Sequence, residues 1–403
     1  ASCGVPQPLL DDGYAAEVRA NLLPFTLTRL TANTCYRFAP PFIAIIAAEG
    51  SGFGVSIADI GWVISISELT GFLAPIIGRF VDRVSRRLSI AIGLIGTTIG
   101  TLTMAVAPNL VVLAIGLTML NLLKSCFDLG MGAWIADHVP FERRGRVVGI
   151  TETSWALSLL IGVSLLGLIT AASSWRVACV VGAAFVVTCG VWLNSRLHAD
   201  TESARGVTHT QIDVARTSGT WLVPLSMFGL MGASQCLFVT FGAWLTDDFG
   251  FDAAGIAAVG FALGAGELLA SISSARLTDR IGKERSVMLG AAVMVPCAAL
   301  LAGFSGSLVI GLAALAVFII GFEYGVVSLI PVATDLYAGL PGKGFGLVIG
   351  AGTFGRGVLT VIATGLYDDT GVVGACVAAM VCAALSALTI AAFAARRSPS
   401  VGR

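Results

Sequence analysis

The ten residues GRFVDRVSRR, residues 78–87, decide the fold, because a related stretch appears again in the same chain. The second copy is ARLTDRIGKE, residues 275–284, which places Asp279 197 positions after Asp82. Both copies lie between long apolar stretches, at the same point of each half of the chain. The recurrence therefore indicates an internal duplication.

Other matches fall at nearly the same offset. Asp128, in FDLG, recurs as Glu323, in FEYG, 195 positions later. Glu68 and Glu267 precede the two Asp-Arg stretches at near-equivalent places. Several matches at almost one offset predict two homologous halves. This organisation is typical of secondary transporters, whose substrate site lies between the halves near the membrane midplane.

The composition excludes a soluble domain. Hydrophobic residues make up 56% of the 403 residues and charged residues only 12%, about half of the roughly 25% typical of soluble domains. The mean hydropathy of +0.90 also excludes intrinsic disorder. The 24 basic and 24 acidic residues cancel, so no net field attracts nucleic acid. The nine cysteines lie mostly in apolar stretches and the three histidines are scattered, so we expect no disulfide scaffold, no metal site and no cofactor.

A membrane-spanning helix needs about 20 apolar residues, and the chain contains about twelve such runs. We predict spans at 23–48, 56–80, 88–107, 110–136, 145–171, 174–196, 221–246, 252–276, 286–304, 307–334, 344–366 and 371–395. The predicted fold is therefore all-α and transmembrane, with twelve helices in two pseudo-symmetric six-helix bundles.

The polar segments divide the chain into five parts. We predict a tail at 1–22, an N-terminal bundle at 23–196, a linker at 197–220, a C-terminal bundle at 221–395 and a tail at 396–403. Basic residues cluster after every even-numbered span, whereas the opposite loops carry almost none. By the positive-inside rule, both tails and the linker are cytoplasmic. The N-terminal segment has no basic region leading into a short apolar stretch, so it looks like a tail rather than a signal peptide.

The pattern G-x-x-x-D-R-x-x-R-R at 78–87 resembles the signature loop of the major facilitator superfamily, and a weaker copy like that at 275–284 is expected there too. The stretches at 142–145 (ERRG) and 174–176 (SWR) are also similar to common features of that family. The resemblance covers 23–395. It implies a twelve-helix transporter whose two halves rock about a central cavity.

The sequence departs from the family pattern at three places. Ser85 stands where the loop usually has Gly, and Gly162-Val163 lacks the proline of the proton-antiporter motif. The fourth segment often carries an arginine in the family, whereas the nearest basic residue here is Lys124. The direction of transport is therefore left open.

The resemblance implies that the signature loop latches the cytoplasmic side of the bundles. The latch residues expected from it are Gly78, Asp82, Arg83, Arg87, Asp279 and Arg280. The alternative is that the arginines only set the topology and bind anionic headgroups.

Nine ionisable residues fall inside the predicted spans, where charge is costly and rarely faces lipid. They are Arg29, Arg37, Lys124, Arg356, Glu68, Asp128, Glu152, Glu267 and Glu323. Four bases and five acids at such depth should mostly pair with one another or line a watery cavity.

Arg37 lies near the middle of its span, beside Asn33 and Tyr36. A guanidinium there can hold a substrate carboxylate or phosphate through two bonds. The alternative is a permanent ion pair with one of three acids: Asp128, Glu68 or Glu152.

Arg356 lies between Gly355 and Gly357, which leave room for a ligand or a close helix. Its alternative role is a counter-ion to Glu323. Further side chains that could line the cavity are Gln235, Tyr324, Trp155 and Phe241.

Lys124 and Asp128 are four residues apart, so they share one helix face and can form an ion pair. Glu323 has isoleucines at 319 and 320, where a lysine would be needed, and so lacks a local partner. A buried carboxylate without a counter-charge can exchange a proton near neutral pH. The candidates for proton coupling are Glu323, Glu267, Asp128 and Glu68, each with a hydrogen-bonded structural role as the alternative.

We therefore expect a secondary active transporter that moves a small organic molecule by alternating access. No ATP-binding motif is apparent, so protons are the expected energy source, and a multidrug-like exporter is one form of this function. An uptake symporter or uniporter for a small anionic solute is the alternative, with Arg37 and Arg356 as anion partners. A membrane sensor or lipid-handling protein is a further alternative. With no nucleophile beside a base, we expect no enzyme, and we expect a monomer in a plasma (inner) membrane.

Overall fold

The computed structural model describes residue 10 and residues 13–197, 219–337 and 341–397, and all of the regular structure in them is helical. The first half contains α1 (Ala16–Phe38), η1 (Pro40–Phe42), α2 (Ile43–Ala47), α3 (Ile57–Leu69), η2 (Thr70–Leu73), α4 (Ala74–Arg83), α5 (Arg86–Ala105), α6 (Leu110–His138), α7 (Phe141–Leu157), η3 (Ser158–Val163), α8 (Ser164–Ala172) and α9 (Trp175–Arg196). The second half contains α10 (Leu222–Phe249), α11 (Ala253–Ile281), α12 (Lys283–Gly303), α13 (Leu308–Thr334), α14 (Pro341–Thr370) and α15 (Val372–Arg397). The prediction of an all-α chain is confirmed.

Polar residues in the short loops fix where several helices begin. Ser56, Asn109, Ser174 and Asp252 each accept a hydrogen bond from the backbone N–H three residues on. Ser56 also receives a reciprocal cap, because the Asp59 carboxylate accepts from the Ser56 backbone N–H. Each cap satisfies a donor that the first helical turn leaves open. Tight connections of this kind hold successive helices antiparallel.

Ten helices among the described residues are long and apolar enough to cross a membrane. An eleventh span is formed if α3–η2 and α4 count as one helix bent by 54°. Helix α1 falls outside this count because it carries Glu17, Arg19, Arg29 and Arg37. These spans agree with a twelve-helix membrane fold, in which α1 is the most polar member.

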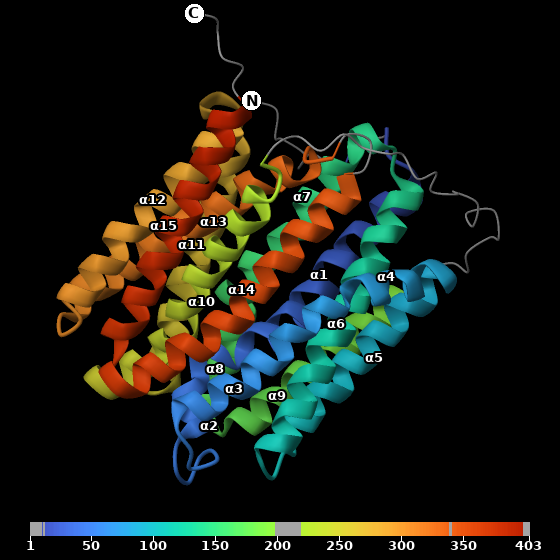
Figure 1. Cartoon of the computed structure of the whole chain (residues 1–403). Helices are drawn as coiled ribbons and strands as arrows, with labels where there is room; N and C mark the ends of the chain where they lie inside the picture. Colours follow the sequence, from blue (N-terminus) through green and yellow to red (C-terminus); the bar gives the residue numbers. More distant parts are fainter. Residues whose placement is uncertain (1–9, 11–12, 198–218, 338–340, 398–403) are drawn as a thin grey trace, which may run out of the picture.

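The two halves form two bundles that lie side by side (Figure 1). The start of α1, the start of α10 and the end of α15 lie toward the top of Figure 1, and we call this end of the bundles the linker side. The opposite end, the far side, carries α2 and the turn between α14 and α15. The predicted linker, 197–220, falls mostly on residues 198–218, which lie outside the described residues.

One seam between the bundles runs along α3 and α14. At its far-side end, the Ala58 backbone N–H donates to Asp368 Oδ2 at 3.0 Å. Nearer the middle, Ser65 Oγ donates to the Gly357 carbonyl oxygen at 2.7 Å. The seam continues to Phe72 in η2, whose ring centroid lies 4.9 Å from that of Phe354. Beyond it, the described side chains of α4 form no hydrogen bond or ion pair with the second bundle.

A second seam depends on glycines that admit a neighbouring backbone. Gly242 of α10 faces the carbonyl oxygen of Pro41 in η1, and a Cβ at Gly242 would collide with that oxygen. Gly264 of α11 faces the backbone of Leu160 in η3 in the same way. The proline pair and the π-helical turn η3 thus supply irregular backbone where the second bundle approaches the first. These contacts pack the two bundles closely against each other.

We expect Gly242→Ala to open the far side, because the added Cβ pushes η1 away from α10. Distances between spin labels at Ala48 and Asp248, measured by pulsed electron resonance, should lengthen. Gly365→Ala is the matched control, since a Cβ at Gly365 meets nothing within 4 Å. The same distance distribution in both variants would contradict this account of the seam.

Candidate functional site

Arg37 and Glu267 form a buried ion pair between the bundles. The guanidinium of Arg37, in α1, donates to both carboxylate oxygens of Glu267, in α11, at 2.7 and 2.9 Å. Arg37 is 3% exposed and Glu267 1%. Arg37 also donates to the Trp155 carbonyl oxygen at 2.8 Å, and its guanidinium lies 4.4 Å from the Trp155 ring centroid and 5.1 Å from that of Phe238. The planar guanidinium donates two parallel hydrogen bonds to the carboxylate, so the contact between Arg37 and Glu267 is strong and directional.

A second ion pair joins the bundles in the opposite sense. Arg356 Nη2, in α14, donates to Glu68 Oε1, in α3, at 3.1 Å. The hydroxyl of Tyr36 lies 2.8 and 2.9 Å from the two carboxylate oxygens of Glu68. Arg356 binds Glu68 through one nitrogen alone, whereas Arg37 binds Glu267 through two. The Arg356–Glu68 pair is therefore the less completely satisfied of the two.

The two acids are related by the internal repeat, but the two bases are not. Glu68 and Glu267 occupy near-equivalent places in the halves, and each reaches a base in the other bundle. Arg37 lies in the first predicted span and Arg356 in the eleventh, whose repeat counterpart is the fifth, so the repeat does not relate the two bases. Each bundle thus supplies one acid and one base to the interface.

A third cluster lies wholly within the first bundle. Lys124 Nζ donates to Asp128 Oδ2 at 2.6 Å, so the predicted ion pair along α6 is confirmed. Arg29 of α1 bridges Asp128, at 3.2 Å, and Glu152, at 2.9 Å. Tyr36 links this cluster to the interface, because its ring centroid lies 5.2 Å from Lys124 Nζ and 5.6 Å from the Arg356 guanidinium. Asp128 thus has two basic partners.

Glu323 is a buried acid that forms no ion pair with a basic side chain among the described residues. Its side chain, in α13, is 5% exposed, and Ser271 Oγ donates to its Oε1 at 2.6 Å. Among the described residues no basic side chain forms an ion pair with it. Glu267, Arg37 and Glu152 lie near enough to act on it electrostatically. Glu323 is therefore an acid with neutral hydrogen-bond support beside two other acids.

The remaining predicted binding residues are buried and held by neutral partners. Asn33 donates to Ser154 Oγ at 3.3 Å, Gln235 donates to Thr360 Oγ1 at 2.9 Å, and Tyr324 donates to Ser286 Oγ at 3.2 Å. Four buried polar atoms in this region have no hydrogen-bond partner: Asn33 Oδ1, Gln235 Oε1, Arg37 Nε and Arg356 Nε. Buried polar atoms without a hydrogen-bond partner are costly, so these atoms are candidates for hydrogen bonds with a bound molecule.

Two predicted pairings are wrong. Arg356 pairs with Glu68 and not with Glu323. Arg37 pairs with Glu267, which was not among its three expected partners. Both errors have one cause: the sequence identifies costly charges but not which helices of the two bundles face each other. Ser271 was missed, because a serine in an apolar helix carries no distinctive sequence signal.

The signature loop lies on the linker side, apart from these pairs. Asp82 is 69% exposed and lies 3.7 Å from Arg86, which also binds Asp137 at 2.8 Å. Arg87 Nε donates to Asn194 Oδ1 at 3.1 Å. The other predicted latch residues are placed as follows: Gly78 has open space around it, Arg83 and Arg280 are exposed, and the Asp279 side chain lies outside the described residues. The loop contacts seen here lie within the first bundle, so its latch role stays a prediction.

Residues 25–364 match the sequence model of the Major Facilitator Superfamily. The match spans most of the chain, and the helical architecture agrees with it. The chain belongs to the Major Facilitator Superfamily.

Two curated relatives are similar to parts of the chain. The uncharacterized MFS-type transporter YwfA of Bacillus subtilis (strain 168) is 27% identical over 274 residues, which cover 63% of this chain and 62% of YwfA. The niacin transporter NiaP of Acinetobacter baylyi (strain ATCC 33305 / BD413 / ADP1) is 26% identical over 133 residues, 31% of this chain and 29% of NiaP. The chain thus spans less than two thirds of the length of these relatives.

Two solved structures share the fold. Both are of a bacterial homolog to the human lysosomal transporter Spinster in an inward-facing conformation. The unoccupied form has a TM-score of 0.75 at 14% identity and covers 96% of this chain and 100% of its own. The occupied form has a TM-score of 0.73 at 15% identity and covers 95% and 98%. At such low identity the likeness establishes the fold alone.

We expect Glu267→Ala to lower the thermal unfolding temperature in detergent markedly, because it leaves the Arg37 charge buried and unpaired, a loss of about 3–5 kcal/mol. The matched control is Asp335→Ala, which breaks an exposed pair with Lys283 of the same bundle and should cost about 1 kcal/mol or less. Similar small shifts in both variants would mean that the Arg37–Glu267 pair does not hold the bundles together.

Proposed function

We propose that this chain is a proton-coupled secondary transporter that moves a small organic molecule across a prokaryotic plasma membrane by alternating access. The observation that carries the proposal is Glu323, a buried acid that accepts from the Ser271 hydroxyl and forms no ion pair with a base among the described residues. Both curated relatives are named as transporters, which supports the class. We further propose that the protein works as a monomer, with each bundle supplying one side of the site.

The basic loops support an orientation in which the linker side is cytoplasmic. In that orientation the far side faces outward, and we propose that the conformation described here is the one open toward the cytoplasm. The signature loop would then latch the cytoplasmic side in the opposite state. Asp82, which is exposed in this conformation, would be available for that contact.

The proton acts through competition for Arg37. When Glu323 is ionised, its charge repels Glu267 and attracts Arg37, which weakens the Arg37–Glu267 pair. When Glu323 carries a proton, it no longer attracts Arg37. The ion pair between Arg37 and Glu267 is then at its strongest, and the seam between the bundles is stabilised. Protonation of one acid thereby shifts the population between two conformations of the bundles.

The balance of buried charge favours exchange of the proton for a cationic or neutral solute. Five acids and four bases occupy the interior of the spans, and four of the acids have a basic partner. One negative charge, that of Glu323, is left over. A proton or a cationic solute neutralises it, and two ligands that compete for one site are moved in opposite directions. This supports an exporter of the proton-antiport type.

We expect Glu323→Gln to abolish proton release from proteoliposomes when tetraphenylphosphonium is added on the opposite face. Proton flux is followed with an internal pH-sensitive dye. Asp335→Asn, an exposed acid at the end of the same helix, should keep the wild-type response. Proton flux of wild-type size in Glu323→Gln would remove Glu323 from the coupling step, and no flux in the wild type would contradict antiport of this cation.

A second candidate, uptake of a small anionic solute, rests on Arg356. This guanidinium donates to Glu68 through Nη2, and its buried Nε has no hydrogen-bond partner among the described residues. A solute carboxylate could therefore displace Glu68, with Tyr36 as an additional donor. The similarity to the niacin transporter, which covers 31% of this chain, supports a small carboxylate as the solute.

For this candidate, nicotinate should raise the thermal unfolding temperature of the wild type, and Arg356→Gln should remove that effect. Glu323→Gln should leave the nicotinate effect in place, because Glu323 is not its ligand. Stabilisation by tetraphenylphosphonium and none by nicotinate would exclude the anion candidate and favour the exporter.

A further inference from the structure

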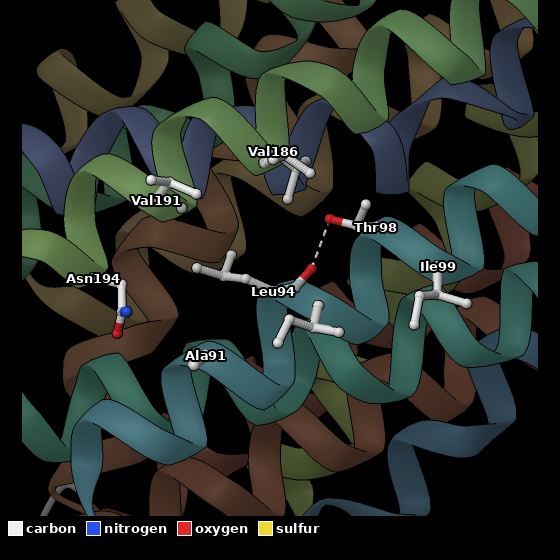
Figure 2. Close-up of a pocket in the computed structure, with 10 residues that line it drawn as sticks. Ala91, Leu94, Thr98, Ile99, Val186, Val191 and Asn194 are labelled. Atoms are coloured by element: carbon white, nitrogen blue, oxygen red, sulfur yellow. Dashed lines mark hydrogen bonds between the residues drawn. The ribbon is translucent and has the colours of Figure 1, made fainter.

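A groove of about 340 Å³ lies between α5 and α9 on the outer face of the first bundle (Figure 2). Its walls are mainly aliphatic, and residues on its rim such as Ile95 and Val191 are 59% and 66% exposed. In a helix of a membrane protein, exposure of this kind means contact with lipid. The hydroxyl of Thr98 is turned back to the Leu94 carbonyl oxygen at 2.9 Å, so it offers little polarity to the groove.

The groove has one polar end. Helices α5 and α9 are antiparallel, because Arg176 at the start of α9 donates to the Ala105 carbonyl oxygen at the end of α5, at 3.0 Å. Asn194 therefore lies at the linker-side end of the groove, one turn beyond Val191. There Asn194 Oδ1 accepts from Arg87 Nε at 3.1 Å. Arg87 therefore lies next to the polar end of the groove, although it is not itself part of the groove lining.

Among the described residues, Arg87 forms no ion pair with an acid. Its side-chain hydrogen bond there is the one from Nε to Asn194, which leaves both terminal nitrogens for a ligand. The nearby acids Asp82 and Asp137 are both engaged by Arg86. Arg196, two residues after Asn194, adds a second exposed positive charge with its guanidinium 5.5 Å from the Trp192 ring centroid.

The second half differs from the first at the position of Arg87. At the repeat position, 197 residues later, the second half has Glu284. The positive charge beside the groove of the first bundle is therefore not repeated in the second half.

We propose that this groove is a binding site for one anionic phospholipid. An acyl chain lies along α5 from Ala91 to Ile99, a length of about 12 Å. The lipid phosphate meets the two terminal nitrogens of Arg87, an arrangement that a planar guanidinium favours. Because the groove is bounded by α5 and α9 of a single bundle, the bound lipid fixes their spacing at the linker side without touching the interface between bundles.

The test is native mass spectrometry of the full-length protein released from detergent with phosphatidylglycerol or phosphatidylcholine. We expect wild-type protein to retain one phosphatidylglycerol more tightly than phosphatidylcholine. Arg87→Gln should weaken phosphatidylglycerol binding about five-fold, the contribution of one arginine at an anionic membrane surface. Val191→Trp, which fills the groove and keeps Arg87, should weaken the binding of both lipids.

Arg285→Gln is the matched control, since it removes an exposed arginine at the start of α12, beside the repeat counterpart of Arg87. It should leave the phosphatidylglycerol preference unchanged. An equal loss in Arg285→Gln and Arg87→Gln would overturn the proposal in favour of general surface attraction. Thermal stabilisation by inorganic phosphate equal to that by phosphatidylglycerol would also overturn it, because the acyl chain would then contribute nothing.

Discussion

Charge buried among membrane-spanning helices must be neutralised, and in this protein the partner is found across the interface between the bundles. Arg37 and Glu267 are both almost fully buried and meet through two hydrogen bonds. In a medium of low dielectric, neither group is stable without the other. The relative position of the bundles is therefore tied to this contact, and any rocking movement must break it or turn about it.

The other charged groups extend this constraint into a connected network. The Arg356–Glu68 pair joins the bundles again, and Tyr36 lies between it and the Lys124–Asp128 pair. Trp155 lies 6.1 Å from Tyr36, centroid to centroid, and supplies its carbonyl oxygen to Arg37. A change of charge at one member is consequently felt at the others. Under the proposed function, such a network would couple ligand binding to the closure of the far side, provided that one member is free to change its charge.

Local features of this site were predictable from the sequence, and features between the bundles were not. The Lys124–Asp128 pair follows from a spacing of four residues on one helix. The isolation of Glu323 follows from the isoleucines one turn before it. The partners of Arg37 and Arg356 depend on which helices face each other after folding, and the repeat misleads there because it relates the acids and not the bases. Helix α1 shows the same limit, since its functional charges make it the least apolar span.

The two halves differ at the repeat position that Asp128 and Glu323 share, and this difference underlies the proposed role of Glu323 as the proton site. Both acids descend from one repeat position. In the first half, Lys124 lies on the same helix and Arg29 reaches across from α1, so the negative charge of Asp128 is compensated twice. In the second half, the lysine position is apolar and Ser271 offers a hydroxyl. A hydroxyl can donate to a carboxylate and accept from a carboxylic acid, so it supports both states of Glu323. Under the proposed function, loss of a base in one copy of the duplicated fold would turn a structural acid into a proton site.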